Sequence, residues 1–285
     1  MKKLIINADD FGLHEEINNG IIRCFQEGCL TSTSLMCGAP AFNNAVALLK
    51  NNEGLGVGVH LTLVGGVAPV LPVEEVKSLV DENGLFFSDY TVFIKNFYLG
   101  KVKKNEIKRE LEAQLLKAAS TGLKFTHVDS HQHLHVLPGI VPIVISLCRQ
   151  FDIHAVRLPG ESYLEDYGYK TVWSRKVGKF GLTFCSKLAA RQFAAAGLLS
   201  PTQFFGMIAG GNISVPVVQK FIASLQEGTG EIMTHPGNSQ NILEELYSWG
   251  YHWEQERDTF VDENIKKEIA VQHISLINFG GLTYE

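Results

Sequence analysis

The sequence predicts an α/β fold organised around a (β/α) barrel-like sheet. Short apolar runs rich in β-branched residues alternate along the chain with longer stretches of helical periodicity. About eight such units can be distinguished, and alternating βα units form a mostly parallel sheet that can close into a barrel. The length of 285 residues lies within the range in which such a barrel forms one domain. We therefore expect a TIM-like barrel, allowing for distortion or a seven-stranded form, with a doubly wound open sheet as the alternative.

The individual elements follow from the same patterns. Strands are expected near residues 3–8, 31–36, 56–63, 124–129, 153–158, 204–208, 231–234 and 274–279. Helices are expected near residues 15–27, 41–51, 105–121, 139–150, 182–196, 215–226 and 254–271. No repeat, low-complexity tract or linker-like stretch marks a boundary, so residues 1–285 are expected to form a single domain.

Two segments are longer than a barrel requires, and both are rich in aromatic residues. Residues 64–104 carry Phe86, Phe87, Tyr90, Phe93, Phe97 and Tyr98. Residues 159–203 carry Tyr163, Tyr167, Tyr169, Trp173, Phe180 and Phe184. Long excursions on a compact scaffold often act as lids or substrate walls. The alternative is that these aromatic side chains cover the core of the barrel.

Composition and charge exclude several classes of protein. Apolar residues make up 45% of the chain and charged residues 19%, which is typical of a globular enzyme and excludes wholesale disorder. The net charge of −5 gives no electrostatic support for binding nucleic acid. Five scattered cysteines without a CxxC pair fit a reducing compartment. Because no apolar run suits a signal peptide or a membrane span, we expect a cytoplasmic protein.

One segment departs from the acidic balance of the chain. Residues 170–200 contain six basic and no acidic residues, together with several aromatic residues. Such a segment can lie on an anionic membrane surface, which would give peripheral contact with the inner membrane. The alternative is a solvated helix face whose charges pair with acidic residues elsewhere.

Polar residues follow several of the predicted strands at the point where each strand ends. The run LIINADDFG stops at Asp9 and Asp10, VGVHLTL contains His60, and EIMTHPG ends at His235. The carboxyl ends of barrel strands share one mouth, so these side chains are expected to converge. Taken singly, adjacent acids are often a turn or helix cap, and a lone histidine is more often a core residue.

The run FTHVDSHQHLH is the densest group of potential metal ligands in the chain. It holds five such residues within nine positions: His127, Asp129, His131, His133 and His135. If this segment is extended, alternation places the last four on the same side. Imidazole and carboxylate groups concentrated in this way are typical of a metal site.

Five motifs distributed over most of the chain point to one family. They are NADDFG at 7–12, TSTSLM at 31–36, GVHLTL at 58–63, THVDSHQHLH at 126–135 and THPG at 234–237. In these motifs the sequence resembles the YdjC-like carbohydrate deacetylases. It is most similar to the branch associated with hopanoid biosynthesis, on the evidence of SLMCGAPAF at 34–42, AVRLPGE at 155–161 and FFG…GG at 204–211.

The resemblance implies a polysaccharide-deacetylase-like fold and assigns roles to particular residues. Asp10, His60 and His131 would hold one divalent metal ion, and Asp9 would be the general base. By analogy with the distantly similar polysaccharide deacetylases, His235 would be the general acid. Two imidazoles and one carboxylate favour Zn²⁺, whereas the family is usually described with Mg²⁺, which prefers oxygen ligands and water.

The chemistry of the residues agrees with these implied roles. A metal held by three protein groups keeps a position for water, lowers the pKa of that water and polarises the acetyl carbonyl. Asp129, His135 and His127 are expected next to the metal ligands, where each either hydrogen-bonds to a ligand or contacts the substrate. Asp129 is expected to orient a ligand histidine, and His135 to contact the substrate, with the remaining histidines structural.

The expected activity is hydrolytic removal of an acetyl group from an N-acetylated carbohydrate. The substrate would be a soluble oligosaccharide or a glycolipid such as an N-acetylglucosaminyl hopanoid, and the resemblance also implies a homodimer. One alternative is a metal-dependent phosphoesterase or amidohydrolase, although most of these bind two metals. Another is a non-catalytic sugar-binding protein, which the retention of Asp9 and the three ligands disfavours.

Overall fold

The structure is a computed structural model that describes residues 1–169 and 173–283. Its sheet has six strands in the order β4-β3-β2-β1-β6-β5, and a seventh strand pairs with the start of β1. All of these pairings are parallel. The strands are β1 (Lys2–Phe11), β2 (Ser32–Leu35), β3 (Gly56–Leu61), β4 (His127–Ser130), β5 (Gln203–Phe205), β6 (Gly228–Thr234) and β7 (Ser275–Leu276).

The sheet curls into a half-barrel, which confirms the predicted α/β barrel-like class. Isolated parallel bridges join Val128 to Val156 and Ala155 to Leu199, between β4 and β5. The prediction of a strand at residues 153–158 is therefore wrong. The backbone of this segment makes two hydrogen bonds to Val128 and two to Leu199 before Pro159, too few for a continuous ladder.

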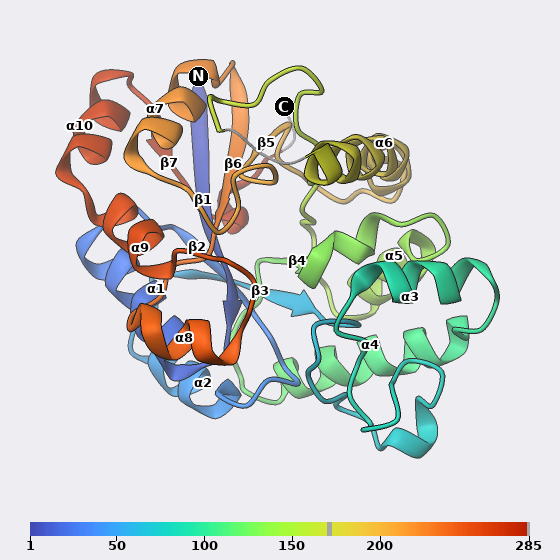
Figure 1. Ribbon diagram of the computed structural model, residues 1–285. Coiled ribbons are helices and arrows are strands. Elements are labelled where there is room, and N and C mark those ends of the chain that lie inside the picture. Colours follow the sequence, from blue (N-terminus) through green and yellow to red (C-terminus); the bar gives the residue numbers. More distant parts are fainter. Residues whose placement is uncertain (170–172, 284–285) are drawn as a thin grey trace.

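Helices connect the strands and cover the outside of the sheet (Figure 1). Most lie close to the predicted positions: α1 (Glu15–Glu27), α2 (Phe42–Lys50), α4 (Lys104–Ala119), α5 (Val141–Gln150) and α7 (Val215–Ser224). The single helix predicted at 254–271 is two helices, α9 (Trp253–Val261) and α10 (Glu263–Val271). Asp262 separates them, because its carboxylate accepts a hydrogen bond from the backbone N–H of Asn264 and so starts a new helix.

Three helices differ from the predictions within the long excursions and near the C-terminus. Helix α6 (Trp173–Ala195) begins earlier than the predicted 182–196, while α3 (Tyr90–Tyr98) and α8 (Gln240–Leu246) were not predicted. Figure 1 shows α3, α5 and α6 on one side of the molecule, across the sheet from α8 and α9. No helix in the described part of the chain has the length and apolar character needed to cross a bilayer.

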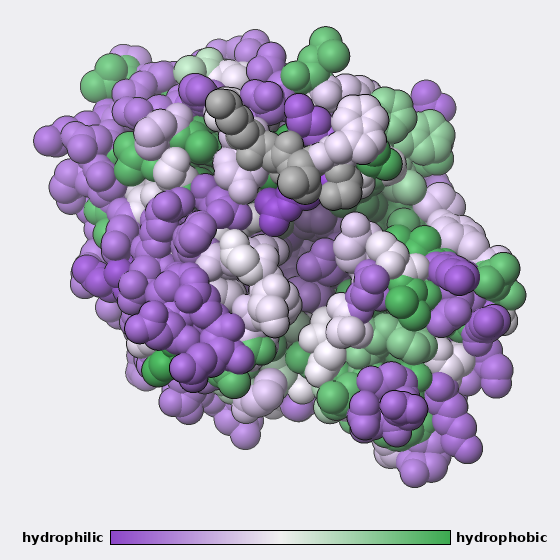
Figure 2. Space-filling model, viewed as in Figure 1, coloured by the Kyte–Doolittle hydropathy of each residue, from purple (hydrophilic) through white to green (hydrophobic). Residues whose placement is uncertain are grey.

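The aromatic residues of the excursions divide between the core and the surface. Phe86, Phe93 and Phe97 are buried in the main hydrophobic core, whereas Tyr90 and Tyr98 are exposed and line a cavity. The 64–104 segment therefore contributes both to the core and to the lining of the cavity. Figure 2 shows this face hollowed near its centre, with hydrophobic side chains gathered on the side of α3 and α6.

Candidate metal and catalytic site

Asp9 and Asp10 come from the carboxyl end of β1, and a distortion of that strand brings both to one place. Adjacent side chains of a regular strand point to opposite faces, so two neighbouring aspartates would normally diverge. Here the pairing of β1 with β2 shifts register between Ala8 and Phe11, and Asp10 has a left-handed φ of 64°. As a result, both carboxylates lie within 4.0 Å of His60 Nε2.

Asp10, His60 and His131 lie together in the structure. Their ligand atoms are all within 4.8 Å of one another, and all three side chains are buried. Asp10 Oδ1 is 3.4 Å from His60 Nε2 and 2.9 Å from His131 Nδ1. The three residues predicted as ligands thus converge from β1, β3 and the turn after β4, as strand ends at one mouth should.

A carboxylate behind His60 fixes the orientation of its ring. Asp129 Oδ1 lies 2.8 Å from His60 Nδ1, so the other ring nitrogen, Nε2, points toward Asp10. Asp129 in turn accepts a hydrogen bond from Ser34 Oγ at 2.8 Å. This carboxylate–histidine arrangement is typical of metal sites, where it sets the tautomer and the direction of the ligand.

The charge of the cluster also fits a cation. Burial alone would lower the pKa of His60, but the negative charges of Asp129 and Asp9 and a hydrogen bond that His60 donates to Asp10 raise that pKa to about 10. An imidazole that holds its proton so strongly lies in a negative field. A divalent ion at the same place would be favoured by that field, so the donor set fits a divalent metal.

A second grouping, formed by Asp9, His60 and Asp129, has ligand atoms equally close together. Its carboxylates are already engaged, because both contact the guanidinium group of Arg157. The Asp10 grouping therefore has the more available ligand atoms.

His235 follows β6 and faces the same cavity. This cavity of about 610 Å³ is lined by Asp9, His60, His131 and His235, among others. The side chain of His235 is largely buried, and its Nδ1 has no hydrogen-bond partner in the described part of the chain. That nitrogen is shielded from solvent and lies 4.0 Å from a carboxylate oxygen of Glu256.

The strand β4 ends at Ser130, so the extended conformation expected through His135 is wrong. Residues His131–Val136 form a short 3₁₀ segment in which Gln132 and His133 have left-handed φ angles. Ser130 Oγ accepts a hydrogen bond from the backbone N–H of His135, which closes this turn. The alternation that placed these side chains on one side therefore does not apply.

The remaining histidines occupy different environments. His127 stacks on Phe279 at 3.7 Å between ring centroids, and burial lowers its pKa to about 3. His135 uses both ring nitrogens inside the protein, with Ser130 Oγ and with the carbonyl oxygen of Arg157. His133 lines the cavity. His135, for which substrate contact is predicted, is not among the residues that line the cavity.

The profile of the YdjC-like protein family matches residues 3–270 of this chain. The chain belongs to the YdjC-like protein family. A carbohydrate deacetylase of Thermoanaerobacter pseudethanolicus is 29% identical to it over 279 residues and covers 98% of both chains. A carbohydrate deacetylase of Brevibacillus brevis is 32% identical over 285 residues, covering 98% of this chain and 99% of the relative. A solved structure from Enterococcus faecalis, described as a candidate cellobiose-phosphate cleavage protein, has a TM-score of 0.81 and 26% identity, with 99% of both chains covered.

In this YdjC-like protein the site includes a buried arginine that the sequence patterns did not reveal. Arg157 donates to both oxygens of Asp9, at 2.7 and 2.6 Å. It also donates to Glu231 at 2.7 Å and lies 2.7 Å from Asp129. Asn7 donates a further hydrogen bond to Asp9 at 2.9 Å. Together these contacts fix the orientation of the Asp9 carboxylate. In the sequence, Arg157 stands out only as part of the AVRLPGE motif at 155–161, which does not show its partners.

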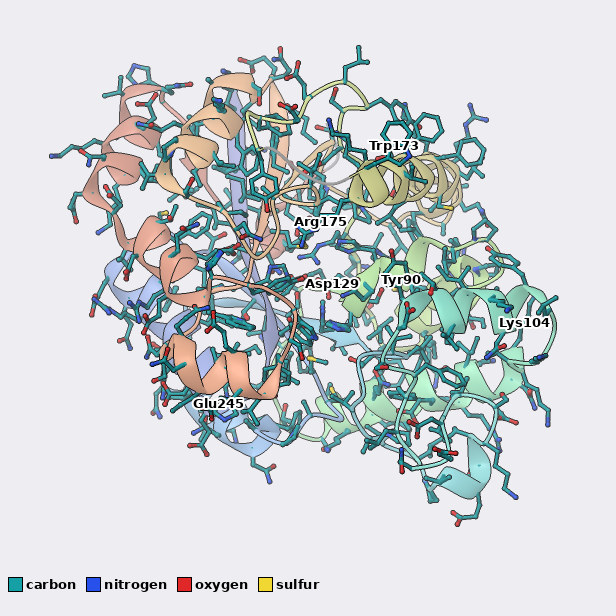
Figure 3. All side chains as sticks on the ribbon, in the orientation of Figure 1. Tyr90, Lys104, Asp129, Trp173, Arg175 and Glu245 are labelled. Carbon is teal, nitrogen blue, oxygen red and sulfur yellow. The ribbon has the colours of Figure 1, made fainter. Side chains whose placement is uncertain are left out.

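The walls of the cavity come from segments far apart in the chain. Tyr90 and Tyr98 of α3 and Arg175 and Val177 of α6 form one side. The loop after α8, with Trp249 and Tyr251, forms part of the lining as well. In Figure 3, Asp129 lies near the centre of the molecule, with Tyr90 on the α3 side and Arg175 on the α6 side.

Proposed function

We propose that this protein is a metal-dependent carbohydrate deacetylase that hydrolyses the acetamide of an N-acetylated sugar. The observation that carries the proposal is the grouping of Asp10, His60 and His131 beside Asp9 within one cavity. The similarity to relatives named carbohydrate deacetylase, over nearly the whole chain, supports this reaction class.

Asp10, His60 and His131 would hold one divalent ion, either Zn²⁺ or Mg²⁺. When bound, the ion polarises the acetyl carbonyl and makes water a better nucleophile. Asp9 accepts the proton that water loses as its oxygen attacks the carbonyl carbon. Arg157 and Asn7 hold the Asp9 carboxylate in the position needed for this transfer.

His235 completes the reaction at the nitrogen of the substrate. The carbon–nitrogen bond breaks readily only when the departing amine takes up a proton. His235 comes from a different strand end and lines the same cavity as Asp9. It therefore supplies the proton to the amine, and the products are acetate and the free amino sugar.

A two-metal phosphoesterase or amidohydrolase is less well supported by the geometry. Two-metal hydrolases need bridging ligands and a second set of free donors. In the described residues the second grouping shares His60 with the first, and Arg157 engages its two carboxylates. One metal per chain is therefore the expected stoichiometry.

Acetate release tests the proposed reaction directly. The wild-type protein loaded with Zn²⁺ or Mg²⁺ should release acetate from N-acetylglucosamine oligomers or from an N-acetylated glycolipid, and a chelator should abolish that release. Asp10→Ala, His60→Ala and His131→Ala should each lower the bound metal, because each removes one of three ligands.

The matched control for these variants is His154→Ala, whose side chain is 74% exposed. It should retain full metal content and activity. Bound metal is measured by elemental analysis after dialysis. Wild-type metal content in all three ligand variants would show that the site lies elsewhere.

We further propose that the sugar is linked to a lipid, as in an N-acetylglucosaminyl hopanoid, and that the protein meets it at a membrane surface. Helix α6 exposes large apolar side chains about once per helical turn: Trp173, Val177, Phe180, Phe184 and Leu188. Exposed apolar groups of this extent usually mark an interaction surface. Val177 and the exposed Tyr90 and Tyr98 of α3 also line the cavity, so this surface borders its mouth.

The charges of α6 support an anionic bilayer as the partner. Lys176, Lys187 and Arg191 are exposed on this helix, which carries no acidic residue. Arg175 and Lys179 donate instead to backbone carbonyl oxygens. The alternative in which this segment pairs with acidic residues elsewhere is therefore not supported for these two side chains.

Co-sedimentation with vesicles tests the membrane contact. Binding should increase when anionic phosphatidylglycerol is added to phosphatidylcholine vesicles, and should weaken as salt is raised. The double substitution Phe180→Ser and Phe184→Ser should weaken vesicle binding relative to the wild type. Val271→Ser, at an exposed apolar position on α10, should leave vesicle binding unchanged. Binding that does not respond to anionic lipid or salt would rule the contact out.

A further inference from the structure

Tyr251 is held rigidly against the wall of the cavity. Its ring lies 4.8 Å from that of His235 and 5.7 Å from that of Trp253, measured between centroids. Gly211, at a left-handed φ of 81°, packs so closely that a Cβ there would overlap the ring. The carbonyl oxygen of Tyr251 accepts a hydrogen bond from Gln240 at 2.7 Å. Few rotamers are therefore open to this side chain.

The hydroxyl of Tyr251 is available although the ring is fixed. It makes no hydrogen bond within residues 1–169 and 173–283, and the residue lines the cavity with Asp9, His60 and His131. Burial raises the pKa of this hydroxyl, and the negative charge of Asp10 raises it further. The hydroxyl therefore keeps its proton at neutral pH and can act as a hydrogen-bond donor.

Two cationic side chains of α6 that line the cavity already donate hydrogen bonds within the protein. Arg175 donates to the carbonyl oxygens of Ile208 and Gly210, and Lys179 to those of Ser162 and Glu165. The unpaired Nδ1 of His133 is shielded from solvent and so cannot reach the open cavity. Tyr251 is a fixed donor with an unused proton, and it lines the same cavity as the metal ligands and His235.

We propose that Tyr251 is a catalytic residue that donates a hydrogen bond to the acetyl oxygen, an inference that rests on the proposed deacetylase reaction. When water attacks the carbonyl carbon, the electron pair of the carbon–oxygen double bond moves onto that oxygen. A donor that is already in position stabilises this charge more in the transition state than in the ground state. No proton is transferred from Tyr251, and the proton for the amine comes from His235.

The variant Tyr251→Phe tests this role, because it removes the hydroxyl and keeps the ring that packs on Gly211. With N-acetylglucosamine oligomers as substrate, kcat should fall by about 10²–10³-fold, the effect of removing one oxyanion donor. KM and bound metal should stay close to the wild-type values, because the contact forms mainly in the transition state.

The matched control is Tyr247→Phe in the same loop, whose hydroxyl donates to the carbonyl oxygen of Leu13 at 3.4 Å. This variant should keep wild-type kcat. A rise in KM alone for Tyr251→Phe would identify a sugar-recognition contact and overturn the proposal, as would loss of metal or unchanged kinetics. If the wild-type protein releases no acetate, the deacetylase function fails and the inference fails with it. An active wild type with a fully active Tyr251→Phe variant overturns the inference alone.

Discussion

Substitution of Asp9 by asparagine should lower kcat by about two to four orders of magnitude and leave the bound metal in place. The amide has nearly the shape of the carboxylate but cannot accept the proton that water loses. It would also place an N–H donor against the donors of Arg157 and Asn7, which now hold both oxygens of Asp9. Acetate release and metal content, measured on the same preparation, distinguish loss of the general base from loss of the metal ion.

Asp152→Asn is the matched control for this substitution, because the Asp152 side chain is 92% exposed. It should leave kcat unchanged. Near wild-type turnover in Asp9→Asn would show that another group takes the proton. Loss of metal would show instead that Asp9 is a ligand, as the second grouping with His60 and Asp129 would require.

Substitution of Arg157 by methionine should reduce the free energy of unfolding by about 3–5 kcal/mol, the cost of breaking a buried ion-pair network on one side. The guanidinium group is fully buried and contacts Asp9, Asp129 and Glu231 at 2.6–2.7 Å. Without it, Asp9 and Asp129 lose their common counter-charge and Glu231 loses a hydrogen-bond donor. Urea unfolding followed by circular dichroism measures the change.

Arg191→Met, at an exposed position on α6, should have little effect in the same assay. If Arg157→Met does not fold, Arg157→Lys remains informative. Lysine keeps the positive charge but lacks the planar guanidinium group that reaches three partners. The free energy of unfolding should therefore fall by less than in Arg157→Met. If Arg157→Met changes the free energy of unfolding by less than about 1 kcal/mol, Arg157 contributes no more than an ordinary surface ion pair. That result would contradict its role in stabilising the buried network.

The site could be predicted where it depends on local strand ends. Asp10 and His60 end apolar runs, and parallel strands bring such ends to one mouth whatever the details of the loops. The helices α1, α4 and α7 were likewise predicted closely, because each has a long apolar periodicity. The curled parallel sheet followed from the alternation of these elements.

Other features depend on contacts that a sequence pattern does not contain. The left-handed backbone at Gln132 and His133 ends the extended segment and redirects the histidines after β4. Arg157 and Tyr251 acquire their roles from partners far away in the chain, such as Asp9 and Gly211. Spacing within one segment carries no information about such partners, so these residues were found only in the structure.

The central claim is that Asp10, His60 and His131 bind one cation beside Asp9. The most direct test is an anomalous difference map from crystals grown with Mn²⁺, which replaces Mg²⁺ or Zn²⁺ at many such sites. The account predicts one peak per chain, about 2.0–2.3 Å from a carboxylate oxygen of Asp10 and from one nitrogen each of His60 and His131. A peak between Asp9 and Asp129, or none near these three residues, would contradict it.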